Sequence, residues 1–380
     1  MRRMHFALLS LVLVLGAQPL VATTYYVTLQ PLSPCTSNKS GISMFFSIQD
    51  AVDSVPAGST INVCSGTYAE QVVISKPLTL RGVSYGNADQ AVIAMPSTAL
   101  VTTTSIYFGT VAAQVQVTAG PVKISNITVD GTPVVSGCPG NATFAILYSS
   151  GSSGTVNEVG TRNQNCNGIG IGAENGSGAP ESVAIENNNI ITASYMGIFA
   201  CSEGSPSTLT VSIKSNYVGQ GEFGIVPYCN VAGSVSGNVV SWAGTDIYAG
   251  SPSTTVSGNT VIGLAGTTGI EVDGGTEISN NSISGAKYGL YLVLPGTITS
   301  NHILNSSGSG IFFEAGSGGS TVRSNIITQA AIGIEFGCTT NTVSGNTING
   351  ATTGLDSVPA SFTGVNTFYN VGTNATSGGC

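Results

Sequence analysis

The sequence predicts an all-β protein, a single-stranded right-handed parallel β-helix (solenoid) behind a short N-terminal capping helix. Two marks recur in phase. The first is V-x-x-N-x-V, as in Val256, Asn259 and Val261. The second is Gly followed by an alternating apolar pair, as in Gly269, Ile270 and Val272, eight to ten residues later. The first mark places asparagine at Asn188, Asn216, Asn238, Asn259, Asn281, Asn301, Asn325 and Asn346. The second places Gly at 197, 224, 269, 289, 310, 333 and 354, with Asp246 in its place before Ile247.

The spacing of these marks, 20 to 28 residues, is typical of a solenoid, whose repeats cannot bury an inner face alone and must stack on neighbours. The apolar runs are short, β-branched and interrupted by Gly, Ser and Asn, so they predict strands rather than helices. The Leu-x-x-Leu-x-Leu frame of leucine-rich repeats is missing. Parallel crossovers are strongly right-handed, which gives the predicted hand.

The recurring asparagine predicts a buried corner ladder. A coil must turn sharply between strands, and Asn tolerates the left-handed backbone conformation that such a corner can use. Stacked Asn side chains can also bond to one another along the stack. Metal ligation is the alternative function of such a row, and the absence of accompanying carboxylates argues against it.

Four segments are expected: a signal peptide at 1–22, an N-terminal cap at 23–57, the parallel β-helix at 58–370 and a C-terminal tail at 371–380. Arg2 and Arg3 precede an apolar run from Phe6 to Leu15, which is typical of an export signal and too short to span a bilayer. We therefore expect a protein that is secreted or resides in the cell envelope, with no membrane insertion.

The net charge predicts that nucleic acid is not a partner. Lys and Arg number 10 against 18 Asp and Glu, and removal of Arg2 and Arg3 with the signal leaves a net charge of −10. Such a surface repels nucleic acid and anionic membranes. It also argues against a polyanionic substrate.

The predicted cap contains a strand at Tyr25–Val27 and a short helix capped by Ser47. Ile48, Ala51, Val52 and Val55 follow the helical spacing of one apolar face. Such a helix can cover the open end of the stack, where unpaired strand edges invite aggregation.

The segment 47–83, SIQDAVDSVPAGSTINVCSGTYAEQVVISKPLTLRGV, resembles the cap and first coils of secreted right-handed parallel β-helix proteins of the pectin-lyase-like superfamily. The resemblance implies the fold and its hand, and the downstream repeats extend it over most of the chain. It does not imply one activity, since the superfamily includes lyases, hydrolases, esterases, epimerases and adhesins.

Specific motifs of those enzymes are missing. Residues 66–70, Gly-Thr-Tyr-Ala-Glu, are similar to the opening motif of pectin methylesterases, but the later motifs for the catalytic aspartates and arginine are not present. Polygalacturonase and pectate-lyase signatures are also absent. We therefore interpret Glu70 as structural and His302 as an outward-facing turn residue.

The eight cysteines are even in number and follow the predicted signal, so disulfides are expected. Cys201 and Cys229 occupy nearly equivalent places after consecutive Gly marks, and adjacent coils lie within disulfide range. Cys138 and Cys166 can be paired by the same argument, a Cys35–Cys64 bond would fix the cap loop and a Cys338–Cys380 bond the tail, but the sequence leaves the connectivity beyond Cys201–Cys229 open. A zinc site is disfavoured because Cys-x-x-Cys is absent. No cofactor or metal is expected.

The strand after each Gly mark predicts one functional surface. Its outward positions should stack into a ribbon that combines carboxylates with aromatic rings, as a sugar-binding cleft requires. The catalytic candidates are Glu271, Asp273, Glu314 and Glu335, and the substrate-binding candidates are Tyr228, Tyr248, Tyr291 and Phe312. Glu271 and Asp273 are roughly 6.6 Å apart along one strand, near the spacing of inverting glycosidases.

Two functions remain open from the sequence. The first is binding, with hydrolysis as the associated activity, of a polysaccharide or surface glycan on this ribbon. A lyase is less favoured, because Lys214 and Arg323 lie at the Asn-marked corners rather than on the acidic strand. The second is a non-catalytic extracellular or envelope β-helix for structure or adhesion, whose outer strand face is ordinary solvated surface.

Overall fold

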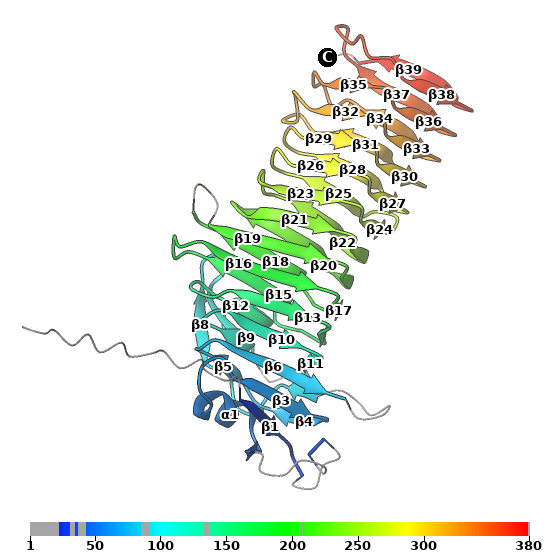
Figure 1. The fold of residues 1–380 in the computed structure, drawn as a ribbon. Helices are drawn as coiled ribbons and strands as arrows, with labels where there is room; N and C mark the ends of the chain where they lie inside the picture. Colours follow the sequence, from blue (N-terminus) through cyan, green and yellow to red (C-terminus); the bar gives the residue numbers. More distant parts are fainter. Residues whose placement is uncertain are drawn as a thin grey trace, which may run out of the picture.

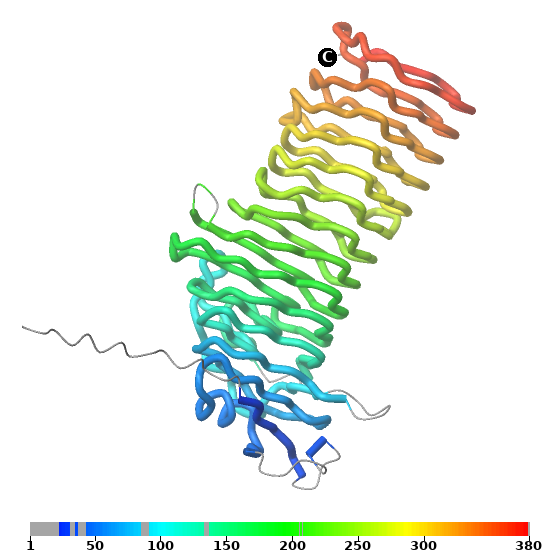
Figure 2. Tube along the Cα trace, in the orientation of Figure 1, coloured from blue at the N-terminus to red at the C-terminus, as the bar shows by residue number. Residues whose placement is uncertain are grey.

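The computed structural model describes residues 23–30, 35–36, 43–84, 91–132, 137–204, 206 and 208–378. The predicted signal peptide lies outside these residues. The chain winds into a long stack of coils, with the N-terminal coils at one end and the C-terminal coils at the other (Figures 1 and 2). Each regular coil contributes three strands that pair in parallel with the coils on either side.

The coils have three faces. The first is a 14-stranded parallel sheet. In spatial order it contains β2 (Met44–Phe45), β1 (Thr24–Val27), β3 (Thr60–Cys64), β6 (Leu78–Val83), β10 (Val122–Ser125), β13 (Gly154–Asn157), β16 (Glu181–Glu186), β19 (Leu209–Lys214), β21 (Ala232–Ser236), β23 (Thr254–Ser257), β26 (Glu277–Ser279), β29 (Thr297–Thr299), β32 (Thr321–Arg323) and β35 (Thr342–Ser344).

The second face follows the corner asparagines. It contains β4 (Gly66–Ala69), β7 (Ala91–Ala94), β11 (Ile127–Asp130), β14 (Gly160–Arg162), β17 (Asn189–Ile191), the first parts of β20 (Tyr217–Cys229) and β22 (Val239–Ala249), β24 (Thr260–Ile262), β27 (Ser282–Ser284), β30 (His302–Leu304), β33 (Ile326–Thr328), β36 (Thr347–Asn349) and β38 (Thr367–Tyr369).

The third face carries the Gly marks and joins the second through the long strands β20 and β22. It contains β5 (Val72–Ile74), β8 (Thr102–Ser105), β9 (Gly109–Val117), β12 (Thr143–Tyr148), β15 (Gly168–Asn175), β18 (Met196–Ser202), the second parts of β20 and β22, β25 (Thr268–Val272), β28 (Tyr288–Leu292), β31 (Ser309–Phe313), β34 (Ile332–Glu335), β37 (Thr353–Val358) and β39 (Thr373–Ser377). Only β8 and β9 pair antiparallel among the described strands.

One hydrophobic core runs the length of the stack, from Val27 to Leu355. It forms because alternate residues of each short strand point inward. In one coil, Val256 of β23, Val261 of β24 and Ile270 of β25 are fully buried, and each lies beside an apolar residue of the next coil. The period-2 pattern in the sequence therefore determines which side chains point into the core of the coil.

The predicted asparagine ladder is present. The side-chain amide of Asn259 donates to Asn281 Oδ1 at 2.9 Å, and its backbone N–H donates to the same oxygen at 3.0 Å. The pattern repeats from Asn188 onward and continues to Asn366, one position beyond the predicted row. The predicted reason for asparagine is partly wrong, because the left-handed backbone belongs to the preceding residue, such as Gly258 or Asn280. The asparagine itself is selected for its buried amide.

The helix α1 (Ile48–Ser54) covers the N-terminal end as expected and packs on β1, β2, β3 and β5. Ser47 is its N-cap, accepting from the Asp50 N–H. The Glu70 carboxylate accepts hydrogen bonds from the Ser47 hydroxyl at 2.8 Å and from the N–H groups of Ile48 and Gln49 at 2.8 and 2.9 Å. Glu70 therefore satisfies the free N–H groups of the helix start, a structural role.

Strand pairing extends on both sides of the expected 58–370 segment. The strand β1 pairs with β3 inside the predicted cap, and β39 pairs with β37 inside the predicted tail. Within the described part of the chain, none of the helices has the length and apolar character needed to cross a membrane.

The predicted Cys201–Cys229 disulfide is present, and so are Cys35–Cys64 and Cys138–Cys166, two of the pairings that the sequence left open. Cys229 lies opposite Ser202 rather than Cys201, one residue away from strict equivalence. It still reaches its partner with a Cα–Cα distance of 5.1 Å. The further Cys338–Cys380 pairing that the sequence suggests involves a residue outside the described range.

Candidate functional site

The structure stacks the predicted ribbon in register on the third face. Paired positions run from Phe199 to Val226, and then from Tyr248 through Glu271, Tyr291, Phe312 and Glu335 to Asp356. From Tyr248 onward these side chains are half-buried, whereas their strand neighbours Ile270 and Val272 are fully buried. We call the outward row Tyr248–Glu271–Tyr291–Phe312–Glu335, with Asp273 and Glu314 beside it, the acidic ribbon.

Asp273 and Glu314 lie at the ends of their strands, where the second predicted row runs. The Asp273 N–H donates to Ala249 O at 3.0 Å, and the Glu314 N–H donates to Leu292 O at 2.8 Å. This pairing keeps Asp273 two residues beyond Glu271 and Glu314 two residues beyond Phe312, on coils that are separated by the coil of Tyr291. The four catalytic candidates therefore lie within four consecutive coils of one face, and the coil of Tyr291 separates Glu271 and Asp273 from Glu314 and Glu335.

Hydroxyl groups hold the carboxylates of the ribbon. The Tyr248 hydroxyl donates to Asp273, and the Ser309 hydroxyl donates to Glu335. Thr245 donates to Glu271 over a longer distance, 3.4 Å. These contacts fix the carboxylates without neutralising their charge.

The ribbon perturbs its own titratable groups. Burial raises the pKa of Glu271, and the nearby charges of Asp273 and Glu314 raise it further. Burial also raises the pKa of Tyr291 to about 12, with additional contributions from its hydrogen bond to Glu314 and the charge of that carboxylate. For Tyr248, burial and then the hydrogen bond to Asp273 raise the pKa. The Glu271 carboxyl is thus shifted toward retaining its proton.

Aromatic rings lie between the carboxylates. Tyr291 stacks on Phe312 with ring centroids 5.1 Å apart and an interplanar angle of 29°. Tyr288 packs against both rings, at 5.3 and 5.2 Å. Lys287 places its Nζ 4.6 Å from the centroid of the Tyr288 ring. The central coils therefore present a ring platform with one adjacent cation.

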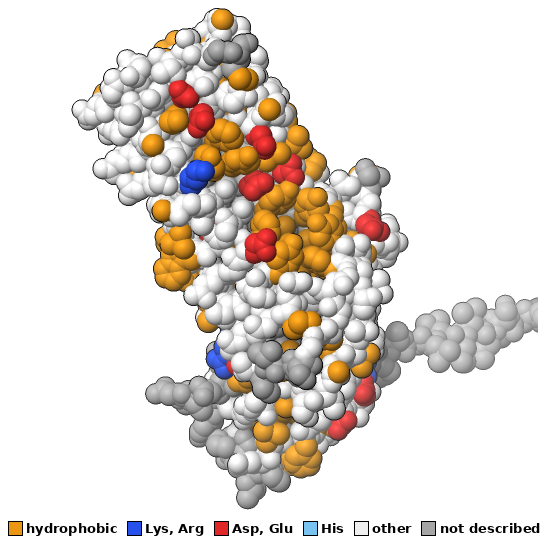
Figure 3. All heavy atoms as spheres, turned by 180° about the vertical axis from the view of Figure 1, so that it is seen from behind, with side chains coloured by type: hydrophobic (Ala, Val, Ile, Leu, Met, Phe, Trp, Pro, Cys, Tyr) orange, Lys and Arg blue, Asp and Glu red, His pale blue; other side chains and the backbone are white. Residues whose placement is uncertain are grey.

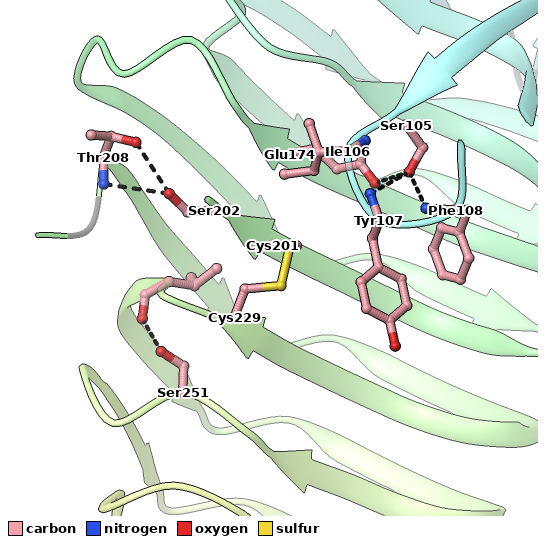
Figure 4. Close-up of a disulfide and its surroundings, with 11 residues drawn as sticks. Ser105, Ile106, Tyr107, Phe108, Glu174, Cys201, Ser202, Thr208, Cys229 and Ser251 are labelled. Carbon is pink, nitrogen blue, oxygen red and sulfur yellow. Dashed lines mark hydrogen bonds between the residues drawn. A yellow bond between two sulfur atoms is a disulfide. The ribbon is translucent and has the colours of Figure 1, made fainter. Parts of the chain in front are cut away.

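Sequence reasoning missed an aromatic cluster next to the ribbon. The β8–β9 hairpin folds over the outer face of β12, β15 and β18 and covers a second hydrophobic cluster that includes Phe144, Phe199 and Val226. At its tip, Ser105 and the Ile106 N–H donate to the buried Glu174 carboxylate, at 2.6 and 3.2 Å (Figure 4). A space-filling view shows a continuous hydrophobic patch at mid-height with acidic side chains along its edge (Figure 3).

Asp246, which replaces a Gly mark, is fully buried in β22. Its Oδ1 accepts from the Ala243 N–H at 3.0 Å, and its Oδ2 has no hydrogen-bond partner among the described residues. Burial raises the pKa of Asp246 to about 8. The sequence could have singled out Asp246, because it places a carboxylate where the other coils carry glycine.

The other candidates lie away from the ribbon. His302 is exposed on β30 of the second face, in a strand rather than the predicted turn. Across the described ranges, no group of three or more His, Cys, Asp and Glu side chains is arranged to hold a metal ion.

Comparison with known proteins supports the fold. Residues 223–372 match the family model described as "Right handed beta helix region". No curated protein matches the chain.

Solved structures with the same architecture include the A-module of the mannuronan C-5 epimerase AlgE6 from Azotobacter vinelandii. It has a TM-score of 0.54 and 16% identity, covering 87% of this chain and 94% of that one. A DFA-IIIase variant from Arthrobacter chlorophenolicus A6 has a TM-score of 0.52 and 15% identity, covering 91% and 98%. At these identities the likeness concerns the fold. The chain is a right-handed parallel β-helix repeat protein.

Proposed function

We propose that this protein binds an uncharged polysaccharide along the acidic ribbon, with the sugar chain running across successive coils. The supporting observation is the single register row in which Tyr248, Glu271, Tyr291 and Phe312 are consecutive neighbours. Rings can pack on the apolar faces of sugars, while carboxylates accept hydrogen bonds from their hydroxyls. The two structural relatives, a mannuronan C-5 epimerase and a DFA-IIIase, are compatible with a carbohydrate ligand.

The charge of the ribbon selects against uronic acid polymers. Glu271, Asp273, Glu314 and Glu335 lie within four consecutive coils of this face, whereas the adjacent cation is Lys287. A polyanion would bring further negative charge close to these carboxylates, which costs free energy unless cations intervene. Uncharged sugars avoid this repulsion.

Within this site we assign hydrolysis to Glu271 and Asp273. Glu271 is the proposed acid, because burial and neighbouring charge raise its pKa. Asp273, which accepts from the Tyr248 hydroxyl, is the proposed base for water. Their i, i+2 spacing, roughly 6.6 Å along the strand, approaches the separation that leaves room for a water molecule in inverting glycosidases.

The second candidate function is that of a non-catalytic β-helix with a structural or adhesive role. The observation in its favour is that Tyr248, Thr245 and Ser309 already donate to ribbon carboxylates. The same hydroxyl–carboxylate hydrogen bonds would form on a solvent-exposed strand face that has no catalytic role. Binding without turnover would favour this candidate.

A glycan array comparing uncharged and uronic polysaccharides tests the proposal. We expect the protein from residue 23 onward to retain one or more uncharged polysaccharides and no uronate polymer. The Glu271→Gln/Asp273→Asn variant should lose that binding or its turnover. Glu277→Gln, which alters an exposed carboxylate on the first face of the next coil, is the matched control. Retention of uronates alone, or of no glycan, would contradict the proposal.

A further inference from the structure

A small aromatic pocket lies where the hairpin meets the N-terminal end of the acidic ribbon. Its volume is about 160 Å³, and it opens between the hairpin tip and the outer face of β18, β20 and β22. The lining residues are Tyr107, Tyr195, Met196, Phe199, Phe223, Val226, Tyr228 and Tyr248. Tyr248 belongs to both the pocket and the ribbon, so the two are continuous.

The pocket is preformed because its hairpin wall is anchored. Tyr107 packs edge-on against Tyr228 at 5.4 Å and contacts Phe199 at 5.5 Å. Immediately before it, Ser105 and Ile106 bond to Glu174, which is buried under the hairpin. The wall therefore stands in place without a ligand.

The lining combines an apolar floor with phenolic hydroxyls. Met196, Phe199 and Val226 are buried, whereas the four tyrosines are at least partly exposed. Tyrosine offers an apolar ring together with a hydroxyl that can donate or accept. This mixture fits a sugar ring, which has an apolar face and polar edges, better than it fits a purely hydrocarbon group.

The size of the pocket selects a single ring. An apolar cavity of about 150 Å³ accommodates a benzene-sized ligand, so 160 Å³ leaves room for one six-membered ring. Beyond Tyr107 the face is closed, because Phe108 covers it and packs on Phe144 at 6.0 Å. A sugar chain lying on the ribbon must therefore end at the pocket.

We propose that this pocket is a terminal subsite that binds the end sugar ring of the uncharged polysaccharide on the acidic ribbon. The inference rests on the proposed function and adds that the protein recognises a chain end. The hairpin, through Tyr107, sets that end.

Saturation-transfer NMR with single-ring probes tests the subsite separately from the ribbon. The probes are the methyl glycosides of glucose, galactose, mannose and xylose, with benzyl alcohol as the apolar competitor. We expect at least one glycoside to receive saturation from the wild type. Tyr107→Ala removes the wall and Val226→Phe fills the floor, and each should weaken that binding at least 10-fold. Tyr217→Ala, which removes an exposed tyrosine on the second face, should leave it unchanged.

The outcomes separate the two proposals. Binding that survives both pocket variants, or no glycoside binding by wild type, overturns the subsite even when the array shows polysaccharide on the ribbon. Benzyl alcohol binding in place of every glycoside also overturns it. Glycoside binding that depends on Tyr107 and Val226, in a protein that retains no polysaccharide, supports the pocket as a sugar site and removes the proposed function of the ribbon.

Discussion

Asn259 shows how one residue type supports the whole stack. It is buried, and its amide donates to Asn281 Oδ1 and to Val235 O, while its own Oδ1 accepts from Asn238. Removal of this side chain takes hydrogen bonds away from buried partners in the coils on both sides. The recurring letter in the sequence was enough to predict the ladder. The left-handed residue before it was not predicted, because Gly, Asn and Ser all occupy that place.

The first prediction concerns this ladder. Asn259→Ala should lower the free energy of unfolding by about 1–3 kcal/mol, the usual cost of leaving buried polar groups without partners. Ser257→Ala, two residues earlier and half-exposed, is the control and should cost far less. Urea midpoints measure both. Equal midpoints would show that the asparagine amide does not hold the corner.

A second prediction follows from Asp246, whose pKa is raised from 3.8 to about 8. Between these values the unfolded chain has released the proton while the folded chain retains it. The free energy of unfolding should therefore fall as pH rises from about 4 to about 8, by at most about 1.4 kcal/mol per pH unit.

Asp246→Asn removes this titration and should flatten the pH dependence of stability in that window. Asn also provides an amide that does not have to lose a charge on burial, so the variant should be the more stable protein at pH 8. Urea unfolding at pH 4.5, 6 and 8 supplies the measurement. A wild-type slope of the opposite sign, or a slope that survives the substitution, would be inconsistent with a buried protonated carboxyl.

Among the elements, the regularly repeated strands could be predicted from the sequence, and the irregular hairpin could not. The strands after each Asn and Gly mark were predictable because a one-residue slip would turn the whole apolar set outward. The β8–β9 hairpin was not, since β8 reads Thr-Thr-Thr-Ser and has no apolar alternation. The pocket depends on that hairpin. The sequence therefore showed that Tyr107 and its neighbours are aromatic, but it did not indicate that they form a pocket.

The third prediction addresses the hairpin. Glu174 is buried and accepts from Ser105 and Ile106, so Glu174→Ala leaves two donors without a partner and loosens the tip. Amide hydrogen exchange of the strands around Ser105 and Ala112 should accelerate about 10-fold or more. Thr104→Ala, an exposed change in the same strand, should not alter it. Unchanged exchange in the Glu174 variant would mean that the hairpin is held by its rings alone.

For the whole molecule, the continuous core and the ladder make the stack a rigid support for surface residues. Side chains on successive coils are then spaced by the strand separation, about 4.8 Å. The sequence predicted which residues would meet on the ribbon, because the Gly marks define the register. It could not predict the hydroxyls of Thr245 and Ser309 that bond to the carboxylates, since both residues are buried and resemble the many other Thr and Ser residues of the strands.

The ring platform carries the fourth prediction. Tyr291 stacks on Phe312 and contacts Tyr288, so its removal takes away the central ring of the platform. Tyr291→Ala should weaken binding of the uncharged polysaccharide by roughly 1–3 kcal/mol, the range of an important interface aromatic. Calorimetric titration measures the change, with Tyr369→Ala, an exposed tyrosine on β38, as the matched control. Equal losses in both variants would remove the platform from the site.

The most direct test is the affinity of the array-selected uncharged polysaccharide for three proteins: wild type, Glu271→Gln/Asp273→Asn and Glu277→Gln. Melting temperatures measured alongside verify that all three fold. The acidic ribbon account predicts that the double variant loses binding or turnover while Glu277→Gln behaves as the wild type. Unchanged binding and turnover in the double variant, with the polysaccharide still bound by the wild type, would place the site elsewhere on the molecule and contradict the account.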